Sequence, residues 1–525
     1  MQRHAQESYY VLGEGLLSEG GGGRAAAADA AGGAPPFRFS RMGPKGTGLQ
    51  IGDTIRKKLA TAMTEGRSSA SRIPSGFTYL GQFVDHDLTF DKTQVMLGED
   101  VSPSQLVQAR SPALDLDSLY GAGPHDPASA KFYEADGIHL KIGRTVPHGQ
   151  SAFNAGFDLP RAGKGPNAAA RRTAVIPDPR NDENLAVAQT HLAFIRFHNR
   201  VADRLPSSTP QAQRFGKARQ MVVKHYQWMI RTDFLPRVCD KAVLNDVFKN
   251  GRKAFEVGAA PTDVPTMPIE FSIAAYRLGH SMIRSAYNWN VNFDHGGGTL
   301  DLLFTFSGLS GDLGGEKELL GIWVADFRRL YNFDQAGRAD LVVPAAKFNR
   351  AKRIDTKISN PLDDLPTRTI GQPGLPDLDP RRNLAFRNLT RANMVTLATG
   401  QQMVRFLKNR GVAVTALTKA QIRDGNGGAK LDGLTPTERD RVLTNTPLWF
   451  YILREAELNG GRLTGVGARI VAETFQRAME GSQWSIVRSP NFRPSLGPDA
   501  NTFRMVDLLL FAANGKAKVL NPNGG

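Results

Sequence analysis

The stretch YLGQFVDHDLTFD, residues 79–91, places a glutamine and a histidine four residues apart, with a carboxylate on each side of the histidine. If residues 76–88 form a helix, Gln82 and His86 share one face and can project into the same cavity, while Asp85 and Asp87 point elsewhere. A neutral histidine can take and return a proton near pH 7. The simpler alternative is a solvent-exposed histidine on a charged helix. The flanking phenylalanine, valine and leucine residues favour a largely buried helix instead.

Three further stretches place an arginine beside a carboxylate, a histidine or an amide: PDPRNDENLAV (residues 177–187) with Arg180 and Glu183, YRLGHSMIR (276–284) with Arg277 and His280, and NLAFRNLTRAN (383–393) with Asn388 and Arg391. Taken alone, the first is typical of a helix N-terminus with acids in its first turn. The second is typical of a histidine satisfied within an apolar core. None of these stretches decides a function by itself.

Helical periodicity dominates the elements that must position these residues. Residues 182–205 carry apolar side chains at helical spacing, acids in the first turn and arginines near the end, which suits the helix dipole. Alternating strand patterns are scarce and short, and stretches rich in Gly and Pro are loops. The sequence therefore predicts a mainly α fold with few short strands and long loops. Further helices are predicted at 210–234, 270–284, 383–408, 435–458 and 463–480, and a loop at 361–380.

The composition excludes several kinds of site. Cys239 is the only cysteine among 525 residues, so the chain has no intramolecular disulfide, Cys-based zinc site or C-x-x-C-H haem attachment. The formal net charge is +16, but the Lys and Arg residues are scattered and no nucleic-acid-binding spacing is present. Nucleic-acid binding is therefore not expected. No run of eighteen apolar residues is present, so no membrane segment is expected.

The first residues differ in composition from the rest. Residues 18–36 are almost wholly Gly, Ala and Pro and cannot contribute to a core. We expect residues 1–37 to be a flexible segment and residues 38–525 to hold a single large domain. The N-terminus lacks the layout of a secretory signal, so a cytoplasmic location or export by a non-classical route is expected.

Together, the four stretches resemble a known family. The combination of G-Q-F-V-D-H-D at 81–87, P-R-N-D-E at 179–183, Y-R-L-G-H at 276–280 and N-L-T-R at 388–391 is similar to the animal-type haem peroxidases of the peroxidase–cyclooxygenase superfamily. The last helical segments look like those of bacterial members. The resemblance covers roughly residues 40–490 and implies one helical haem-peroxidase domain closed around a single haem b.

The resemblance implies a role for each matching residue. His86 would be the distal histidine, with Gln82 beside it in the cavity where peroxide or a small anion binds, and Arg180 would be the distal arginine. On the other side of the haem, His280 would be the proximal iron ligand and Asn388 its hydrogen-bond partner. The remaining matches lie at the haem edge: Asp85 and Glu183 as the carboxylates that form ester bonds, and Arg277 and Arg391 as the cations that face the propionates.

The same resemblance implies a calcium ion bound by Asp87 and a second segment. SPALDLDSLYG, residues 111–121, has the alternating layout of the family's calcium loop, ending in Tyr-Gly. Alternate residues of an extended segment project to one side, and calcium prefers carboxylate, hydroxyl and carbonyl oxygens. An ordinary acidic turn is the alternative. The expected ligands beside Asp87 are Ser111, Ala113, Asp115 and Asp117. Because calcium is plentiful outside cells, the extracellular location is favoured.

The implied activity is the reduction of hydrogen peroxide through a ferryl intermediate, with oxidation of halides, pseudohalides or phenolic one-electron donors. Asn184 stands where the most oxidising mammalian relative has a methionine, so no sulfonium link to the haem is expected. Two alternatives remain: a fatty-acid dioxygenase of the same superfamily and a non-enzymatic, calcium-stabilised scaffold. In the dioxygenase branch a radical tyrosine lies three residues before the proximal histidine, where this chain has Arg277. Tyr276 is adjacent but turned by about 100° on a helix. The donor and the oligomeric state stay open.

Overall fold

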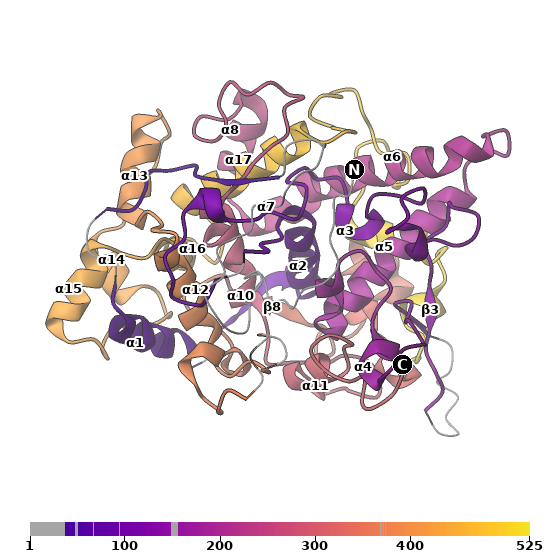
Figure 1. Cartoon of the computed structure of the whole chain (residues 1–525), viewed down its shortest axis with the longest axis horizontal. Coiled ribbons are helices and arrows are strands. Elements are labelled where there is room, and N and C mark those ends of the chain that lie inside the picture. The colour runs from indigo at the N-terminus through magenta and orange to yellow at the C-terminus, as the bar shows by residue number, and fades with distance from the viewer. Residues whose placement is uncertain are drawn as a thin grey trace.

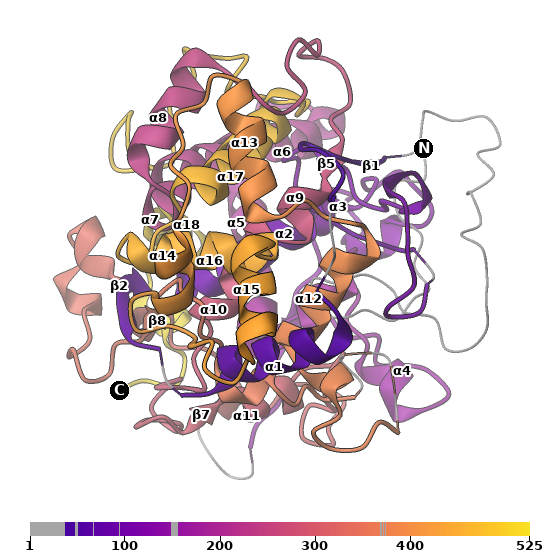
Figure 2. The same ribbon diagram turned by 90° about the vertical axis from the view of Figure 1, so that its left-hand side faces the viewer.

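The computed structural model describes residues 37–525, except 48–50, 67, 94, 149–155, 368, 369, 371 and 373. The segment expected to be flexible, residues 1–37, therefore lies outside the described residues apart from Phe37. Helices of very different length surround α2, which lies near the middle of the molecule in both views (Figures 1 and 2). The predicted mainly α fold with few short strands is confirmed.

The α-helices of the described ranges are α1 (Asp53–Thr64), α2 (Gly76–Leu88), α3 (Asp117–Tyr120), α4 (Ala168–Arg172), α5 (Leu185–Asp203), α6 (Gln211–Met229), α7 (Leu235–Val238), α8 (Lys241–Asn250), α9 (Ile269–Ser272), α10 (Gly279–Met282), α11 (Leu300–Thr305), α12 (Leu384–Met394), α13 (Gly400–Asn409), α14 (Lys419–Asp424), α15 (Pro436–Thr444), α16 (Leu448–Leu458), α17 (Gly465–Glu480), α18 (Met505–Ala512) and α19 (Ala517–Leu520). Two 3-10 turns matter for the site, η3 (Pro179–Asp182) and η5 (Ala275–Leu278).

The strands described in this structure are short and form pairs rather than a larger sheet. The parallel pair joins β1 (Phe39–Ser40) to β5 (Met267–Pro268). The antiparallel pairs join β2 (Ala70–Pro74) to β8 (Arg350–Lys352), β3 (Gly143–Arg144) to β4 (Phe157–Asp158), and β6 (Ala286–Tyr287) to β7 (Gly298–Thr299).

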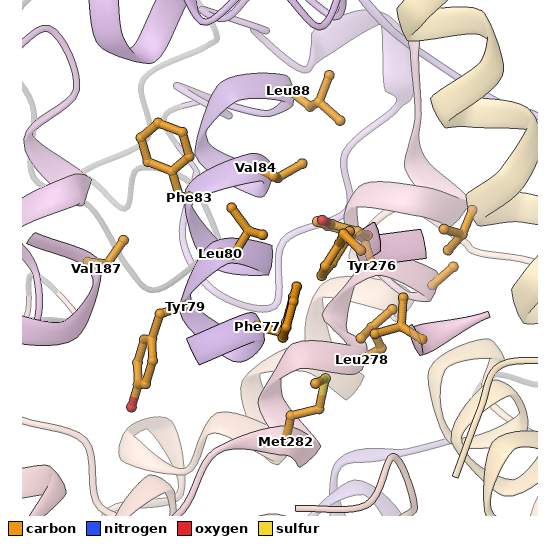
Figure 3. Close-up of a cluster of buried hydrophobic side chains, with 14 of the residues drawn as sticks. Phe77, Tyr79, Leu80, Phe83, Val84, Leu88, Val187, Tyr276, Leu278 and Met282 are labelled. Atoms are coloured by element: carbon orange, nitrogen blue, oxygen red, sulfur yellow. The ribbon is translucent and has the colours of Figure 1, made fainter. Parts of the chain in front are cut away.

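The helix α2 has the predicted bounds, and both of its flanks are buried. Phe83 stacks on Phe194 of α5 with ring centroids 4.4 Å apart, and Phe77 and Val84 point to the opposite side, toward the segment around Tyr276 (Figure 3). Each such buried side chain contributes about 1.5–3 kcal/mol relative to an exposed one. This packing on two sides holds the remaining polar face of α2 in one fixed direction.

Three predicted helices are interrupted in the structure. Pro447 separates α15 from α16, because a proline disfavours helical backbone in the residue before it. Thr399 begins α13 afresh, since its hydroxyl accepts from Gln402 N while Gln402 Oε1 accepts from Thr399 N. Ala274, with φ −131° and ψ −71°, leaves the helical region between α9 and η5. The prediction that 435–458, 383–408 and 270–284 each form one continuous helix was therefore wrong.

Within the described ranges, no helix is both long enough and apolar enough to cross a bilayer.

Candidate active site

A cavity lies between α2 and the segment that runs from η5 into α10. His86 from α2 and His280 from α10 both line it, although they are far apart in the sequence. Three other predicted site residues form part of the wall: Gln82, Asp85 and Arg277.

His86 is buried and held by an amide. Its Nδ1 lies 2.8 Å from Asn181 Oδ1, and Asn181 Nδ2 lies 2.9 Å from His191 Nδ1. Because an amide oxygen only accepts, His86 carries its proton on Nδ1 and leaves the Nε2 lone pair bare. Burial, and then the nearby charge of Arg180, lower the pKa of His86 to about 3, so the ring is neutral near pH 7. His86 is thus prepared to accept a proton at Nε2.

Glu183 lies on the Nε2 side of His86. Its Oε1 is 3.5 Å from His86 Nε2 and accepts a hydrogen bond from Gln82 Nε2, while Gln82 Oε1 accepts from Asn184 Nδ2 at 3.1 Å. Glu183 Oε2 is buried and has no hydrogen-bond partner among the described residues. Burial raises the pKa of Glu183 to about 8 and that of Asp85 to about 6. Both carboxyl groups are therefore kept closer to the neutral form than exposed acids.

Arg180 lies behind His86 rather than on the cavity wall. Its Nη2 donates to the carbonyl oxygens of His86, at 3.1 Å, and Thr89, at 2.7 Å. Asp178 accepts from its Nε at 3.0 Å and from its Nη2 at 2.8 Å. Burial alone would lower the pKa of Arg180, but attraction to Asp178 outweighs it and raises that pKa. Asp178 also accepts from Arg110, so one buried carboxylate holds two arginines.

The proximal side is also held by an amide. Asn388 Nδ2 lies 2.9 Å from His280 Nδ1, and Asn388 Oδ1 accepts from Arg277 Nη1. Trp449 lies edge-on to His280, with ring centroids 6.4 Å apart. Burial, and then Arg277, lower the pKa of His280 to about 3. Asn388 is the predicted partner of His280, but its amide nitrogen faces the ring instead of the expected oxygen, because Arg277 occupies the oxygen.

Arg391 reaches the same region from α12. It forms an ion pair with Asp91 through Nη2. Its Nε and Nη1 are buried and have no hydrogen-bond partner within the described ranges. Two buried donors of a permanent cation therefore remain available for an anionic group.

The predicted calcium ligands are only partly brought together. Asp87 accepts from Leu116 N at 3.2 Å and from Ser118 N at 3.3 Å, because Leu116 adopts a left-handed conformation with φ 57°. Burial, and then the charge of Asp117, raise the pKa of Asp87 to about 7 and that of Asp115 to about 6.

Three other oxygens of the predicted ligands have protein partners. Asp117 Oδ1 accepts from Arg219 at 3.2 Å, Asp115 accepts from Ser482, and Ser111 Oγ accepts from Ala113 N at 3.3 Å. In the part of the chain that the structure describes, no group of three or more His, Cys, Asp or Glu residues has an arrangement that could hold a metal. The calcium ligand set stays a prediction.

Comparison with known proteins shows which family this chain is similar to. Residues 91–306 match the family model of the animal haem peroxidase. Less than half of the chain lies within this match. The matched range includes the predicted residues from Ser111 to His280, and it begins after His86 and ends before Asn388.

Curated relatives match this chain over a limited part of their length. Mouse thyroid peroxidase is 26% identical over 193 residues, which is 35% of this chain and 20% of that protein. Heme peroxidase 2 of Caenorhabditis elegans is 26% identical over 178 residues, which is 33% of this chain and 23% of that protein. The aligned part thus spans about a fifth of these relatives.

Solved structures share the fold over almost the whole chain. Peroxidase A from Dictyostelium discoideum gives a TM-score of 0.56 at 14% identity and covers 96% of this chain and 99% of that one. The fatty acid alpha-dioxygenase of Arabidopsis thaliana gives 0.52 at 11% identity, with coverage of 93% and 77%. At these identities the likeness establishes the fold alone.

A flat cofactor fits the cavity on several observations. Gly81 and Gly279 line it without side chains, and a Cβ added at Gly279 would meet nothing within 4 Å. Glu183 Oε2 and two nitrogens of Arg391 are buried without hydrogen-bond partners among the described residues, although neither residue lines the cavity itself. Iron at His280 Nε2 requires a proton on Nδ1, so binding it there requires the Asn388 amide to turn and Arg277 to leave it.

Sequence reasoning missed four residues of this site. Asn181 and Asp178 flank Arg180 in a stretch typical of a helix N-terminus, and their contacts depend on the folded backbone. His191 lies nearly two turns into α5 in an apolar pattern, where it resembles a core histidine. Tyr276 was considered only as a radical site, although it lines the cavity. The sequence signal that could have found Asn181 and Asp178 is their adjacency to Arg180.

Proposed function

We propose that this chain is a peroxidase that reduces hydrogen peroxide and oxidises a small donor, either a halide or pseudohalide or a phenol. The observation that supports the proposal most is that His86 and His280 line one cavity. Each ring is held by an amide from a different element: Asn181 contacts His86, and Asn388 contacts His280. The family match supports the haem, and the donor and reaction are inferred from the residues present.

Several residues of the site would hold haem b. His280 would bind its iron, and Arg277 and Arg391 would bind its carboxylates, since Arg277 is a cation on the cavity wall and Arg391 is a cation on the helix of Asn388. Bound haem supplies an iron at which peroxide is reduced and oxidising equivalents are stored. Asp85 on the wall and Glu183 next to it are our candidates for ester bonds to the haem edge.

His86 moves the proton. With Nδ1–H donated to Asn181, the bare Nε2 takes a proton from peroxide and returns it to the departing oxygen. A positioned base of this kind contributes typically 10²–10⁴-fold to a rate. Gln82 and Glu183 lie beside Nε2 and orient the peroxide by hydrogen bonds.

Arg180 acts on the distal histidine from outside the cavity wall and stabilises negative charge that develops near it. It is protonated at any working pH, and its bonds to the carbonyl oxygens of His86 and Thr89 fix the end of α2. In this arrangement Arg180 positions His86 and adds positive potential, which favours negative charge on the peroxide oxygen.

A fatty-acid dioxygenase is the second candidate. The observation that favours it is the buried hydroxyl of Tyr276 on the cavity wall, together with the shared fold of the plant dioxygenase. Against it, Arg277 stands where that branch has its tyrosine. Oxygen uptake with a fatty acid, measured for the wild type and Tyr276→Phe, distinguishes the two.

The test of the proposal is turnover by haem-loaded protein. The absorption spectrum is recorded before and after hydrogen peroxide, and iodide, bromide, thiocyanate and phenols are then added in turn. A peroxide-dependent spectral change that one donor class reverses is expected. A loaded protein whose spectrum does not respond to peroxide would contradict the proposal and favour a scaffold role.

A further inference from the structure

A second cavity lies between α5, α18 and α19, on the side of α5 that faces away from α2. It shares no lining residue with the candidate active site. Gln189, Ala193 and Arg196 of α5 line it, and their spacing of four and three residues places them on one helix face. Phe194, which packs on α2, is two residues from Arg196 and is therefore turned about 160° away from it. Helix α5 thus separates the two cavities.

The wall of this second cavity is apolar apart from two side chains. Among the described residues that line it, only Gln189 and Arg196 have polar side chains, and only Arg196 is charged. The amide of Gln189 is engaged with the backbone, since Nε2 donates to Phe157 O and Oε1 accepts from Ala325 N, both at 3.4 Å. The apolar part of the wall includes Leu192, Val324, Phe327, Leu509, Val519 and Leu520.

Arg196 has no acidic partner. Its guanidinium lies over the ring of Phe157, 4.2 Å from the centroid, and that of Arg144 lies over the same ring at 4.7 Å. Neither a carboxylate nor a hydrogen-bond acceptor among the described residues stabilises Arg196. Burial, and then the charge of Arg144, lower the pKa of Arg196 to about 10, so it remains a cation near pH 7. An anion beside these two like charges would relieve their repulsion.

The carbonyl groups near the end of α18 do not account for this cation. A helix end leaves its last carbonyl groups without partners inside the helix, and a nearby arginine often binds them. Here Leu509 O accepts from Ala513 N at 2.9 Å, and Leu510 O accepts from Gly515 N at 2.8 Å. These carbonyl groups are therefore paired with the backbone, and the guanidinium of Arg196 stays available to a ligand.

An apolar wall that carries one guanidinium group fits a ligand with an apolar part and one anionic group. A guanidinium pairs with a carboxylate through two parallel N–H···O bonds. The cavity volume is about 30 Å³, which leaves room for about two water-sized groups. The apolar part of the ligand must therefore be short. A halide or inorganic phosphate has no apolar part to bury, whereas a short-chain carboxylate has both parts.

We propose that this cavity binds a short-chain carboxylate, whose carboxylate group pairs with Arg196 and whose alkyl group occupies the apolar space between α5 and α18. The inference assigns Arg196 as a ligand-binding residue and Phe157 as the ring that holds its guanidinium. It goes beyond the proposed peroxidase function and does not depend on it, because the two cavities share no lining residue.

The test is a calorimetric titration of the folded chain with butyrate, acetate and butyramide. It is run with and without haem, so that a failure to bind haem leaves it intact. We expect one butyrate per haem-loaded chain, with an unchanged haem absorption spectrum. Acetate should bind about fivefold more weakly, because fewer methylene groups leave water. Butyramide should bind at least about tenfold more weakly, because it has no charge to pair with the guanidinium.

Three variants locate the site. Arg196→Gln should weaken butyrate binding at least about tenfold and leave butyramide binding unchanged, since only the ion pair is lost. Ala512→Leu, at a half-buried lining residue, keeps the charge and narrows the cavity, so it should weaken both ligands. The matched control is Arg204→Gln, because Arg204 lies over the ring of Phe511 at 5.5 Å and does not line the cavity. It should leave butyrate affinity unchanged.

Three outcomes would overturn the inference. They are the absence of saturable butyrate binding, an unchanged butyrate affinity in Arg196→Gln, and equal losses in Arg196→Gln and Arg204→Gln. The last would mean that the positively charged chain attracts anions in general. Absence of peroxide turnover, with the butyrate preference intact, would refute the proposed function alone.

Discussion

Asn181 Oδ1 lies 2.8 Å from His86 Nδ1, and the same amide donates from Nδ2 to His191 Nδ1 at 2.9 Å. All three side chains are buried. One amide therefore fixes both the orientation and the proton position of the distal imidazole, and His191 fixes the amide. This bridge makes His86 a base at Nε2 before any ligand arrives.

Removing the hydrogen-bond acceptor at position 181 should impair the action of His86 as a base while the histidine itself stays in place. Asn181→Leu is expected to slow the reaction with peroxide about 10–100-fold, because the ring loses the partner that holds its tautomer. Asn181→Asp keeps an acceptor and should restore most of the rate. Stopped-flow kinetics measure the rate, and ¹⁵N shifts of the histidine ring in the haem-free chain report the tautomer. A wild-type His86 protonated on Nε2 would refute this role.

The fold itself was easier to predict from the sequence than this bridge. The bounds of α2 could be predicted because they depend on local sequence, namely the spacing of its apolar residues and the residues at its termini. The family resemblance implied that His86 and His280 face one cofactor, and both residues line one cavity. The Asn181 contact depends on how η3 docks against α2, and the interruptions at Ala274 and Pro447 depend on backbone geometry that helical periodicity conceals.

Asp178 should be a large contributor to stability. It is fully buried between Arg110 and Arg180, so Asp178→Asn leaves buried positive charge uncompensated. We expect the free energy of unfolding to fall by about 3–5 kcal/mol. The matched control, Asp340→Asn, breaks an exposed pair with Arg338 and should change the free energy of unfolding little, because solvent screens exposed ion pairs. Denaturant titration measures both, and a similar small loss for both variants would contradict the structure.

His225 predicts a pH dependence of stability. Burial lowers its pKa to about 4, its Nδ1 donates to Met221 O at 2.7 Å, and its Nε2 accepts from Ser495 N at 2.9 Å. The unfolded chain binds a proton near pH 6.5 and the folded chain only near pH 4. Stability from this group is therefore present above pH 6.5 and lost as the pH falls from about 6.5 to about 4.

Replacing His225 should flatten this pH dependence. His225→Gln is expected to reduce the slope of unfolding free energy against pH by up to about 1.4 kcal/mol per pH unit in that window. His295→Gln, the same substitution at an exposed histidine, is measured beside it as the matched control. Equal slopes for the wild type and His225→Gln would show that His225 is not held neutral.

Calcium binding at Asp87 and Asp115 is a prediction that melting curves can decide. A cation would stabilise the charged form of two carboxyl groups whose pKa values burial raises to about 7 and about 6. Calcium should raise the melting temperature, and at a hundredfold excess over its dissociation constant it adds about 2.7 kcal/mol. Asp115→Asn should remove most of that gain. Identical melting in calcium and in chelator would contradict a calcium site at this cluster.

The most direct test of the central claim is a haem titration of the wild type, His280→Ala and His295→Ala, followed by absorption spectroscopy. The account predicts that the wild type and His295→Ala bind one haem per chain with the same histidine-ligated spectrum, and that His280→Ala loses the haem or binds it with an altered spectrum. A wild-type chain that binds no haem, or a His280→Ala variant with unchanged affinity and spectrum, would contradict it.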